Sequence, residues 1–171
     1  MPTAIPDHLA PDLDILFVGF NPSLKSGETG HHYANPHNRF WKILHLSGLT
    51  PRLYRAEEDR ELLKLGYGFT NIVERPTQRA DQITKEEYRV GRLRLMQKIA
   101  DLRPRVVCFV GKGVYLQYSG KKSAAWGLQE SSVIPGVQEF VAPSSSGLVR
   151  MKLDEIVAIY AELARLIKLS Q

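Results

Sequence analysis

The sequence has little cysteine and no long apolar run. Its 171 residues include one cysteine, Cys108, within the apolar stretch "VVCFV" at residues 106–110. A single cysteine excludes an internal disulfide, and its apolar surroundings predict a buried small hydrophobe. No stretch approaches the roughly 18 apolar residues of a membrane span, and residues 1–11 lack the pattern of a secretory leader. We therefore expect a soluble cytoplasmic protein with no membrane partner.

Long runs of one charge are also missing. Lys and Arg number 23 against 18 Asp and Glu, which gives a formal net charge of +5. This mild surplus favours an anionic partner such as nucleic acid, although it is also an ordinary solubility feature. The densest basic cluster, "RVGRLR", covers residues 89–94, and the other basic residues are dispersed. Any anionic partner must therefore meet a surface that folding assembles.

The order of apolar patterns indicates the fold class. Runs of strand length occur at 14–19, 67–72, 105–110 and 138–142. Helical patterns lie between and after them, at 38–47 with Asn38 as N-cap, at 84–101 with a capping box that starts at Thr84, and at 153–169. This alternation predicts an α/β fold, a three-layer sandwich with a central, mostly parallel, four- to five-stranded sheet flanked by helices. We expect one domain over residues 1–171, with an irregular segment at 1–12.

The predicted sheet also locates the functional site. In open α/β sheets, ligands bind beyond the carboxyl ends of the strands. Four loops lie there, at 19–37, 73–83, 111–113 and 143–151. Asn-Pro and three glycines in the first of them predict no regular element before Asn38.

The first loop, "GFNPSLKSGETGHHYANPH", carries two side chains suited to binding. Asn21 offers an amide that can hold a water, although Asn-Pro is also common turn chemistry. Tyr33 could stack on a planar ligand or plug the core. The loop histidines could suggest a metal, but no cysteine or second ligand set accompanies them, so we expect no metal and no cofactor; they are His31, His32 and His37.

The two later loops offer weaker signals. "VGKGVY" at 110–115 resembles a phosphate-binding turn but lacks the P-loop spacing, so Lys112 is a weak anion contact. "APSSSGLVRMK" at 142–152 combines hydroxyls, an apolar Leu148 and bases. It lacks the G-x-S-x-G pattern of a serine hydrolase. The hydroxyls suit phosphate contacts and the leucine suits a wedge between bases, although a Ser/Gly surface turn is the simpler reading.

Taken together, "GFNPS…TGHHYANPHNRFW", "TNIVERPT" and "PSSSGLVR" resemble one enzyme family. The chain looks like the mismatch-specific uracil-DNA glycosylase and thymine-DNA glycosylase branch of the uracil-DNA glycosylase superfamily, over roughly residues 13–168. The resemblance implies a monofunctional glycosylase of base excision repair. Such an enzyme flips uracil or a related damaged pyrimidine, such as ethenocytosine, out of a mismatch with guanine and hydrolyses its N-glycosidic bond. The implied partner is double-stranded DNA, and we expect a monomer.

The resemblance also assigns roles to residues of the first loop. Asn21 would position the attacking water, and no lysine nucleophile is needed. Phe20 and Tyr33 would line the base pocket, with Tyr33 stacking on the flipped ring and Ser26 in the segment that closes over it. Ser23 stands where bacterial members usually read glycine, and it adds a hydroxyl beside the water.

The fourth loop would contact the DNA duplex. Leu148 would fill the vacated stack, the backbone of Gly147 and Val149 would face the widowed guanine, and Arg150 would contact phosphate. Ser144, Ser145 and Ser146 stand where bacterial members read Asn-Pro-Ser, which is closer to the thymine-DNA glycosylase pattern. Lys25 and Lys112 would be phosphate contacts.

Two questions stay open at this stage. The departures at Ser23 and at 144–146 leave the base preference undecided between uracil and thymine opposite guanine. Asp81, in the loop after the second strand, could polarise the water more strongly than an amide, or it could be a solvated or helix-capping residue. A catalytically weak damage-binding module and a nucleotide-binding metabolic enzyme are the alternative functions.

Overall fold

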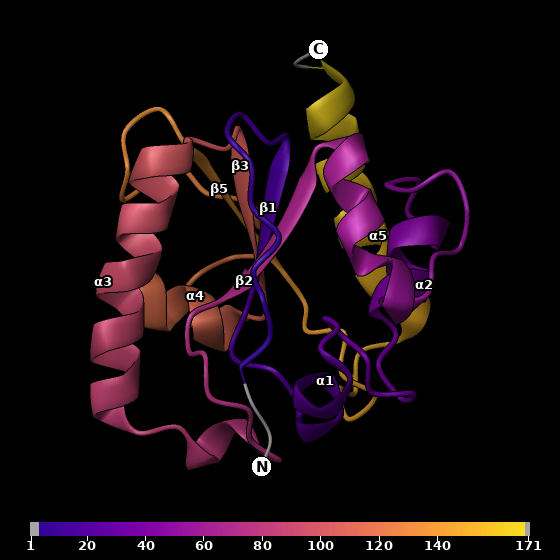
Figure 1. Ribbon diagram of the computed structural model, residues 1–171. Helices are drawn as coiled ribbons and strands as arrows, with labels where there is room; N and C mark the ends of the chain where they lie inside the picture. The colour runs from indigo at the N-terminus through magenta and orange to yellow at the C-terminus, as the bar shows by residue number, and fades with distance from the viewer. Residues whose placement is uncertain (1–3, 170–171) are drawn as a thin grey trace.

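The computed structural model describes residues 4–169 and contains a five-stranded sheet of order β2-β1-β3-β5-β4. Four strands are parallel: β1 (Ile15–Gly19), β2 (Tyr67–Asn71), β3 (Val106–Val110) and β5 (Gln138–Ala142). The short β4 (Gly127–Leu128) pairs antiparallel with β5. Helices cover both faces of the sheet (Figure 1). The predicted α/β fold with a mostly parallel sheet is confirmed.

Two apolar cores lie on opposite faces of the sheet. Ile15 and Phe17 of β1 belong to one core, whereas Leu16 and Val18 belong to the other, because successive side chains of a strand point to opposite faces. The first core is closed by α2 (Phe40–Leu46) and α5 (Leu153–Leu169). The second is closed by α3 (Lys85–Leu102) and α4 (Lys112–Ser119). Cys108 is fully buried in the first core, as its apolar neighbours predicted.

The predicted helices are present with small shifts at their ends. Thr84 and Glu87 form the expected capping box of α3, with the Thr84 hydroxyl accepting from the Glu87 N–H at 3.1 Å. The N-cap of α2 is Arg39 and not the predicted Asn38, although the Asn38 side chain accepts from the Phe40 N–H at 2.9 Å.

The sequence predicted no regular element in the loop at 19–37, and this prediction is wrong. It contains α1 (Leu24–Thr29), whose N-cap is Ser23 and whose C-cap is Gly30 in the left-handed conformation. Asn-Pro ends β1, but a serine after proline supplies the cap that starts a new helix. Two 3₁₀ elements were also unexpected, η1 (Ala56–Leu65) and η2 (Ala80–Gln82).

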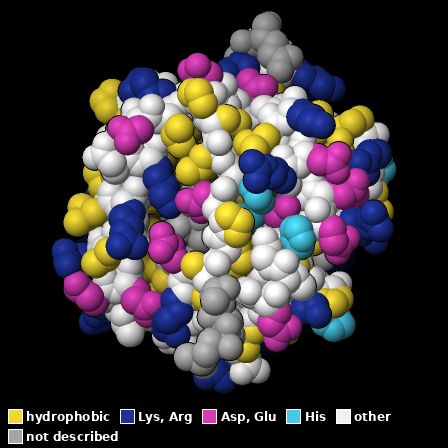
Figure 2. Space-filling model, viewed as in Figure 1, with side chains coloured by type: hydrophobic (Ala, Val, Ile, Leu, Met, Phe, Trp, Pro, Cys, Tyr) yellow, Lys and Arg dark blue, Asp and Glu magenta, His cyan; other side chains and the backbone are white. Residues whose placement is uncertain are grey.

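The molecule carries its charges in a dispersed pattern. In Figure 2, Lys and Arg side chains alternate with Asp and Glu across the visible face, without a continuous basic stripe.

Among the described residues, the helices are too short or too polar to cross a membrane. Residues 4–12 contain no helix, and His8 forms an isolated antiparallel bridge with Phe69 of β2. The first three residues of the predicted irregular segment lie outside the described range.

The register of the parallel strands gathers their carboxyl ends. Gly19 of β1 lies opposite Asn71 of β2, and Val110 of β3 lies opposite Ala142 of β5. The four loops named from the sequence therefore leave the sheet along one edge, beside α1 in Figure 1.

Helix α3 approaches the end of β2 closely at Gly91. A methyl group at this position would overlap the backbone oxygen of Ile72, the residue that follows β2. Gly91 is buried, so the helix has no room to move outward without opening the second core. The glycine therefore sets the distance between α3 and the loop that leaves β2.

We predict that Gly91→Ala destabilises the protein, although alanine favours a helix over glycine by about 1 kcal/mol. The overlap with backbone should cost about 2–3 kcal/mol in the free energy of unfolding, measured by urea denaturation. Leu93→Ala on the exposed side of α3 is the control and should change stability little, because Leu93 is 54% exposed. Equal stability of Gly91→Ala and wild type would contradict the close packing.

Candidate active site

A pocket of about 770 Å³ lies at the carboxyl edge of the sheet. Its walls come from the loop at 19–37, the end of β2, the loop at 73–83 and the serine-rich loop at 143–151. It contains most of the site residues predicted from the sequence, namely Phe20, Asn21, Ser23, Ser26, Tyr33, Ser144, Ser145, Ser146, Gly147 and Leu148. The strand order thus brings together residues that are more than 120 positions apart in the chain.

The Asn21 side chain is held in one orientation by the neighbouring loop. Its Nδ2 donates to the backbone oxygen of Arg75 at 2.7 Å and to the Thr77 hydroxyl at 2.9 Å. Thr77 is buried and donates in turn to the backbone oxygen of Arg79 at 2.7 Å. Because Nδ2 is committed to these two oxygens, Oδ1 is the amide atom that remains to accept a hydrogen bond from a bound molecule.

An ion pair braces the segment that holds Asn21. Arg75 Nε and Nη2 donate to the two carboxylate oxygens of Glu87 at 2.8 and 2.9 Å, and Nη2 also donates to the Gln82 backbone oxygen. The hydrogen bonds from Arg75 lower the pKa of Glu87 to about 2. Arg75 therefore connects the Asn21 amide to the first turn of α3.

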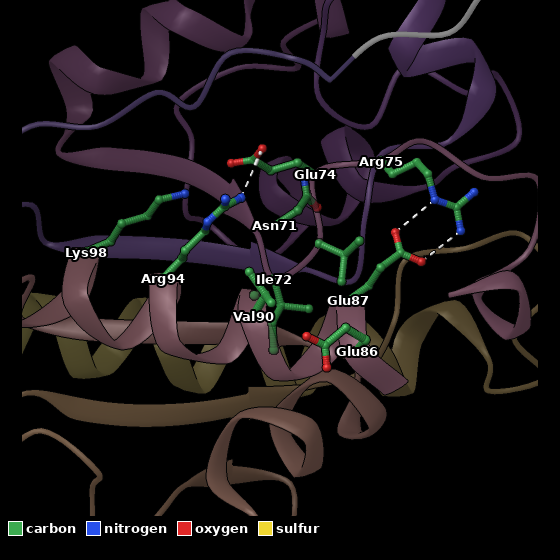
Figure 3. A pocket seen from close by; sticks show the side chains of 11 residues that line it. Asn71, Ile72, Glu74, Arg75, Glu86, Glu87, Val90, Arg94 and Lys98 are labelled. Atoms are coloured by element: carbon green, nitrogen blue, oxygen red, sulfur yellow. Dashed lines mark hydrogen bonds and ion pairs between the residues drawn. The ribbon is translucent and has the colours of Figure 1, made fainter. Parts of the chain in front are cut away.

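A smaller pocket of about 290 Å³ lies behind this brace, between α3 and the residues that follow β2 (Figure 3). Two ion pairs lie among its charged side chains. Arg75 pairs with Glu87, and Arg94 lies 3.6 Å from Glu74. Asn71 lines both pockets. We interpret the smaller pocket as part of the support for the larger one.

The Ser23 and Ser26 hydroxyls hold the backbone of the first loop through hydrogen bonds. The Ser23 hydroxyl accepts from the Ser26 N–H at 3.1 Å and so caps α1. The buried Ser26 hydroxyl accepts from the Ala34 N–H at 3.1 Å, which ties α1 to the segment that carries Tyr33. Both predicted hydroxyls line the pocket, and both are engaged in holding the backbone around it.

Tyr33 is fixed by its backbone and by an aromatic neighbour. It has a left-handed backbone conformation, with φ of 51°, and its ring stacks on Phe40 with 3.8 Å between centroids. The hydroxyl is buried and makes no hydrogen bond within residues 4–169, and burial raises the pKa of this phenol above its usual value. The ring itself is half-buried, packs on the core residue Phe40 and lines the pocket, and its stacking on a planar ligand stays a prediction.

Asn71 is a site residue that the sequence analysis missed. It ends β2, and a methyl group on Gly19 would lie 2.7 Å from its Oδ1 and 3.2 Å from the Tyr33 hydroxyl. Gly19 thus leaves room for both polar groups at the pocket floor. The segment "GFTN" could have indicated this residue, because Asn71 stands at the end of an apolar run, at the edge of the sheet where ligands bind.

Phe20 packs against the turn that follows β3. A methyl group on Gly113 would lie 2.5 Å from Cζ of Phe20, and Gly111 has φ of 119°, which only glycine adopts without strain. The Gly-Lys-Gly turn therefore serves the packing of Phe20 into the pocket wall. Lys112 does not line the pocket, and its Nζ lies 4.2 Å from the centre of the Trp126 ring.

The serine-rich loop is tied to the start of α2. The Arg39 N–H donates to the Ser145 backbone oxygen at 2.9 Å, and Arg39 Nη2 donates to the Ser146 backbone oxygen at 3.2 Å. At its beginning, the Pro143 backbone oxygen accepts from the Tyr160 hydroxyl of α5 at 2.7 Å. Ser145 is buried, so the loop is anchored and does not extend freely into solvent.

Leu148 stands at the tip of this anchored loop. It is 93% exposed, the largest exposed fraction of any large hydrophobic side chain that the structure describes. Gly147 lies against the backbone of His37, where a methyl group would come within 2.7 Å of the His37 oxygen. The Leu148 N–H is held by the Ser146 hydroxyl at 3.2 Å. An apolar side chain is thus presented to solvent by a braced turn at the pocket rim.

Five predicted residues lie outside the pocket lining. Lys25 and Arg150 are exposed, Val149 packs against the first core, and Lys112 faces Trp126. The side chain of Asp81 is 74% exposed, and its carboxylate accepts from Arg79 Nε at 3.1 Å. The structure therefore gives no geometric support to Asp81 as a catalytic group, because its carboxylate is engaged in a surface ion pair.

The three histidines of the first loop occupy different surroundings. His37 is exposed at the pocket rim, whereas His31 and His32 both contact the buried carboxylate of Asp59. Burial is the main cause that lowers the pKa of His32 to about 4. Burial alone would raise the pKa of Asp59, but its close contacts with the His8 ring, the His32 N–H and the His31 ring outweigh burial and lower this pKa to about 2.

We predict that His32 makes the folded state sensitive to mild acid. The unfolded chain protonates His32 near pH 6.5, whereas the folded chain does so only near pH 4, so stability falls as the pH drops through this interval. The contribution of His32 is about 2 kcal/mol between pH 7 and pH 5. Urea unfolding at both pH values, in metal-free buffer, should show a smaller pH dependence for His32→Gln. An identical dependence would contradict the buried neutral ring.

Comparison with known proteins identifies the family. The model of the uracil DNA glycosylase superfamily matches residues 6–164. A protein from Methanosarcina acetivorans, solved by NMR in solution and provisionally described as a uracil DNA glycosylase, has a similar fold, with a TM-score of 0.58 and 21% identity over 95% of this chain and 98% of its own. This family points to hydrolytic cleavage of a base from DNA. The chain belongs to the uracil DNA glycosylase superfamily.

Proposed function

We propose that the protein is a monofunctional DNA glycosylase that removes uracil, or a related damaged pyrimidine, from mismatches with guanine in double-stranded DNA. The observation that carries this proposal is the Asn21 amide, which is locked by Arg75 and Thr77 at the mouth of a pocket large enough for a base. A role in base excision repair follows from this activity. We propose that the protein acts as a monomer and without a cofactor.

In this proposal, Asn21 Oδ1 holds the attacking water. The water adds to the anomeric carbon of the sugar while the glycosidic bond breaks, its electron pair leaves with the base, and the proton of the water passes to solvent or to the departing base. The sugar passes through a cationic, oxocarbenium-like state, so the reaction needs correct placement and fixed dipoles more than a strong nucleophile. An amide that is already oriented before the substrate binds fits this requirement.

The flipped base would lie between Asn21 and the wall formed by Phe20 and Tyr33. Tyr33 offers a ring whose other face is braced by Phe40, so stacking on the base would need no rearrangement. The Asn71 amide can both donate and accept, which suits the edge of a pyrimidine with adjacent N–H and carbonyl groups. Ser23 and Ser26 would hold the surrounding backbone in place through the contacts described above.

Leu148 would enter the gap left by the flipped nucleotide. Flipping costs a few kcal/mol of unstacking and is easiest at a mismatch, so the weak G·U pair is the favoured substrate. The backbone of Gly147 and Val149 would face the unpaired guanine. Contacts to phosphate would come from Lys25, Lys112, Ser144, Ser146 and Arg150, whereas the buried Ser145 would anchor the loop.

The identity of the excised base is a finer part of the proposal. Uracil and ethenocytosine are the substrates we favour, and thymine opposite guanine is the alternative that the resemblance of "GHHY" and of residues 144–146 to thymine-DNA glycosylases supports. We assign no catalytic role to Asp81, because its carboxylate is paired with Arg79.

We predict that Asn21→Ala lowers the single-turnover rate on a duplex with one G·U pair by at least about 100-fold, as expected for loss of a preoriented dipole at the reacting centre. Strand cleavage at the abasic product measures the rate. Asp81→Asn is the matched comparison and should react like wild type.

The same assay separates the alternative functions. A wild-type protein that binds the G·U duplex without forming an abasic site would be a damage-binding module, and the enzyme proposal would fail. Preference for a free nucleotide over duplex DNA would indicate a metabolic enzyme instead. A slow Asp81→Asn variant would restore that carboxylate to the site.

We predict that Leu148→Ala weakens the enzyme at the flipping step. The rate on G·U duplex should fall by about tenfold or more, because the apolar side chain no longer occupies the vacated stack. Fluorescence of 2-aminopurine beside the target base would report the loss of flipping. Leu46→Ala removes a leucine that is 51% exposed on α2 and should leave both signals unchanged. Wild-type flipping by Leu148→Ala would rule out the wedge.

A further inference from the structure

A second group of reactive side chains lies beside the pocket. His8 from the N-terminal segment, His32 from the first loop and Asp59 from η1 are all buried, with exposed fractions of 6%, 2% and 1%. One ring nitrogen from each histidine and one oxygen from Asp59 lie within 4.8 Å of one another. The proposed base excision uses none of them as a reacting group.

The buried carboxylate of Asp59 has no strong cation beside it among the described residues. Its ion pairs are with His8 Nε2 at 3.1 Å and His31 Nδ1 at 3.2 Å, and its remaining contact is the His32 N–H at 2.8 Å. A buried carboxylate is costly unless a positive charge or a metal ion compensates it. Histidines can supply that charge only when they are protonated.

Both histidines have a ring nitrogen within 4.8 Å of an Asp59 oxygen that can bind a metal ion. His32 Nε2 lies 2.9 Å from the backbone oxygen of Pro6, which can only accept, so Nε2 carries the proton and Nδ1 carries the lone pair. A ring N–H that donates to a backbone carbonyl is the usual way in which proteins orient a metal-binding histidine. His8 Nε2 is buried and close to Asp59, and it makes no well-aligned hydrogen bond to the part of the chain that the structure describes.

We propose that His8, His32 and Asp59 bind a divalent transition-metal ion of the zinc type. Two imidazoles and one carboxylate form a donor set common for this ion. The 3.1 Å between His8 Nε2 and Asp59 Oδ2 is close to the separation of about 3.3 Å expected between ligands in a tetrahedral site with bonds near 2.0 Å. The half-exposed His31 or a water molecule can complete the coordination.

We expected no metal from the sequence, because no cysteine or second set of metal ligands accompanies the histidines of the first loop, His31, His32 and His37. The fold keeps His32 and adds His8 and Asp59, which are 24 and 27 residues away in opposite directions along the chain. A ligand set assembled from three separate segments has no recognisable spacing.

The metal would join the three segments that meet behind the base pocket. His8 is bridged to β2 through Phe69, and Ile5, three residues earlier, lines the pocket. His32 precedes Tyr33, which stacks on Phe40. A bound ion would therefore hold the N-terminal segment and the Tyr33 backbone in place, as a structural element and not as a participant in base excision.

We predict that chelator-treated protein binds ZnCl₂ with a stoichiometry of one by calorimetry. Its thermal midpoint should rise by about 5–10 °C at a hundredfold excess over the dissociation constant. CoCl₂ should give the visible absorption of a four-coordinate site. His8→Gln and Asp59→Asn should each weaken binding by more than the roughly 10- to 100-fold that an outer-shell change costs, whereas His8→Cys should keep a site because thiolate is also a zinc ligand.

His45→Gln is the matched control, because His45 is an exposed histidine on α2 and should bind zinc like wild type. Thermal midpoints in chelator show whether each variant folds. No heat and no change in the wild-type midpoint with zinc would overturn the site. Equal affinities for wild type, His8→Gln and Asp59→Asn would also overturn it and would indicate surface binding. These measurements contain no DNA, so their outcome is independent of glycosylase activity.

Discussion

The side-chain amide of Asn21 is held by two oxygens that belong to another part of the chain, and the site depends on this arrangement. An amide after a strand can rotate unless its nitrogen is occupied. Here the nitrogen meets Arg75 and Thr77, which follow β2, and β2 lies beside β1 in parallel register. The contact exists only because the neighbouring strands end together. Sheet register, and not the Asn-Pro turn by itself, orients the proposed catalytic group.

The alternation of apolar runs and helical patterns was sufficient to predict the architecture. Strands buried on both faces appear as continuous apolar runs, so β1 and β3 could be located to within one residue. Short elements could not be found in this way. β4 has two residues, and η1 is rich in charge with only Asp59 and Leu62 buried, so neither leaves a periodic signal.

The pocket was predictable where its residues lie in the loops that follow strands. Asn21, Tyr33 and Leu148 come from such loops and do line one cavity. The residues that orient them were not predictable, because their roles arise from single long-range contacts. Asp81 shows the opposite case, since it lies in the correct loop yet its carboxylate faces Arg79 at the surface. Loop membership therefore indicates proximity to a site, but not direction.

The parallel arrangement of the strands also has a consequence for the order of folding. Parallel neighbours cannot be joined by a tight turn, so each pairing closes a long stretch of chain, and such distant pairings form late. β1 and β2 are separated by 47 intervening residues, and the serine-rich loop contacts Arg39 more than 100 positions earlier. The pocket can therefore form only when nearly the whole chain has condensed. A fragment that ends before β5 would lack the Leu148 wall of the pocket.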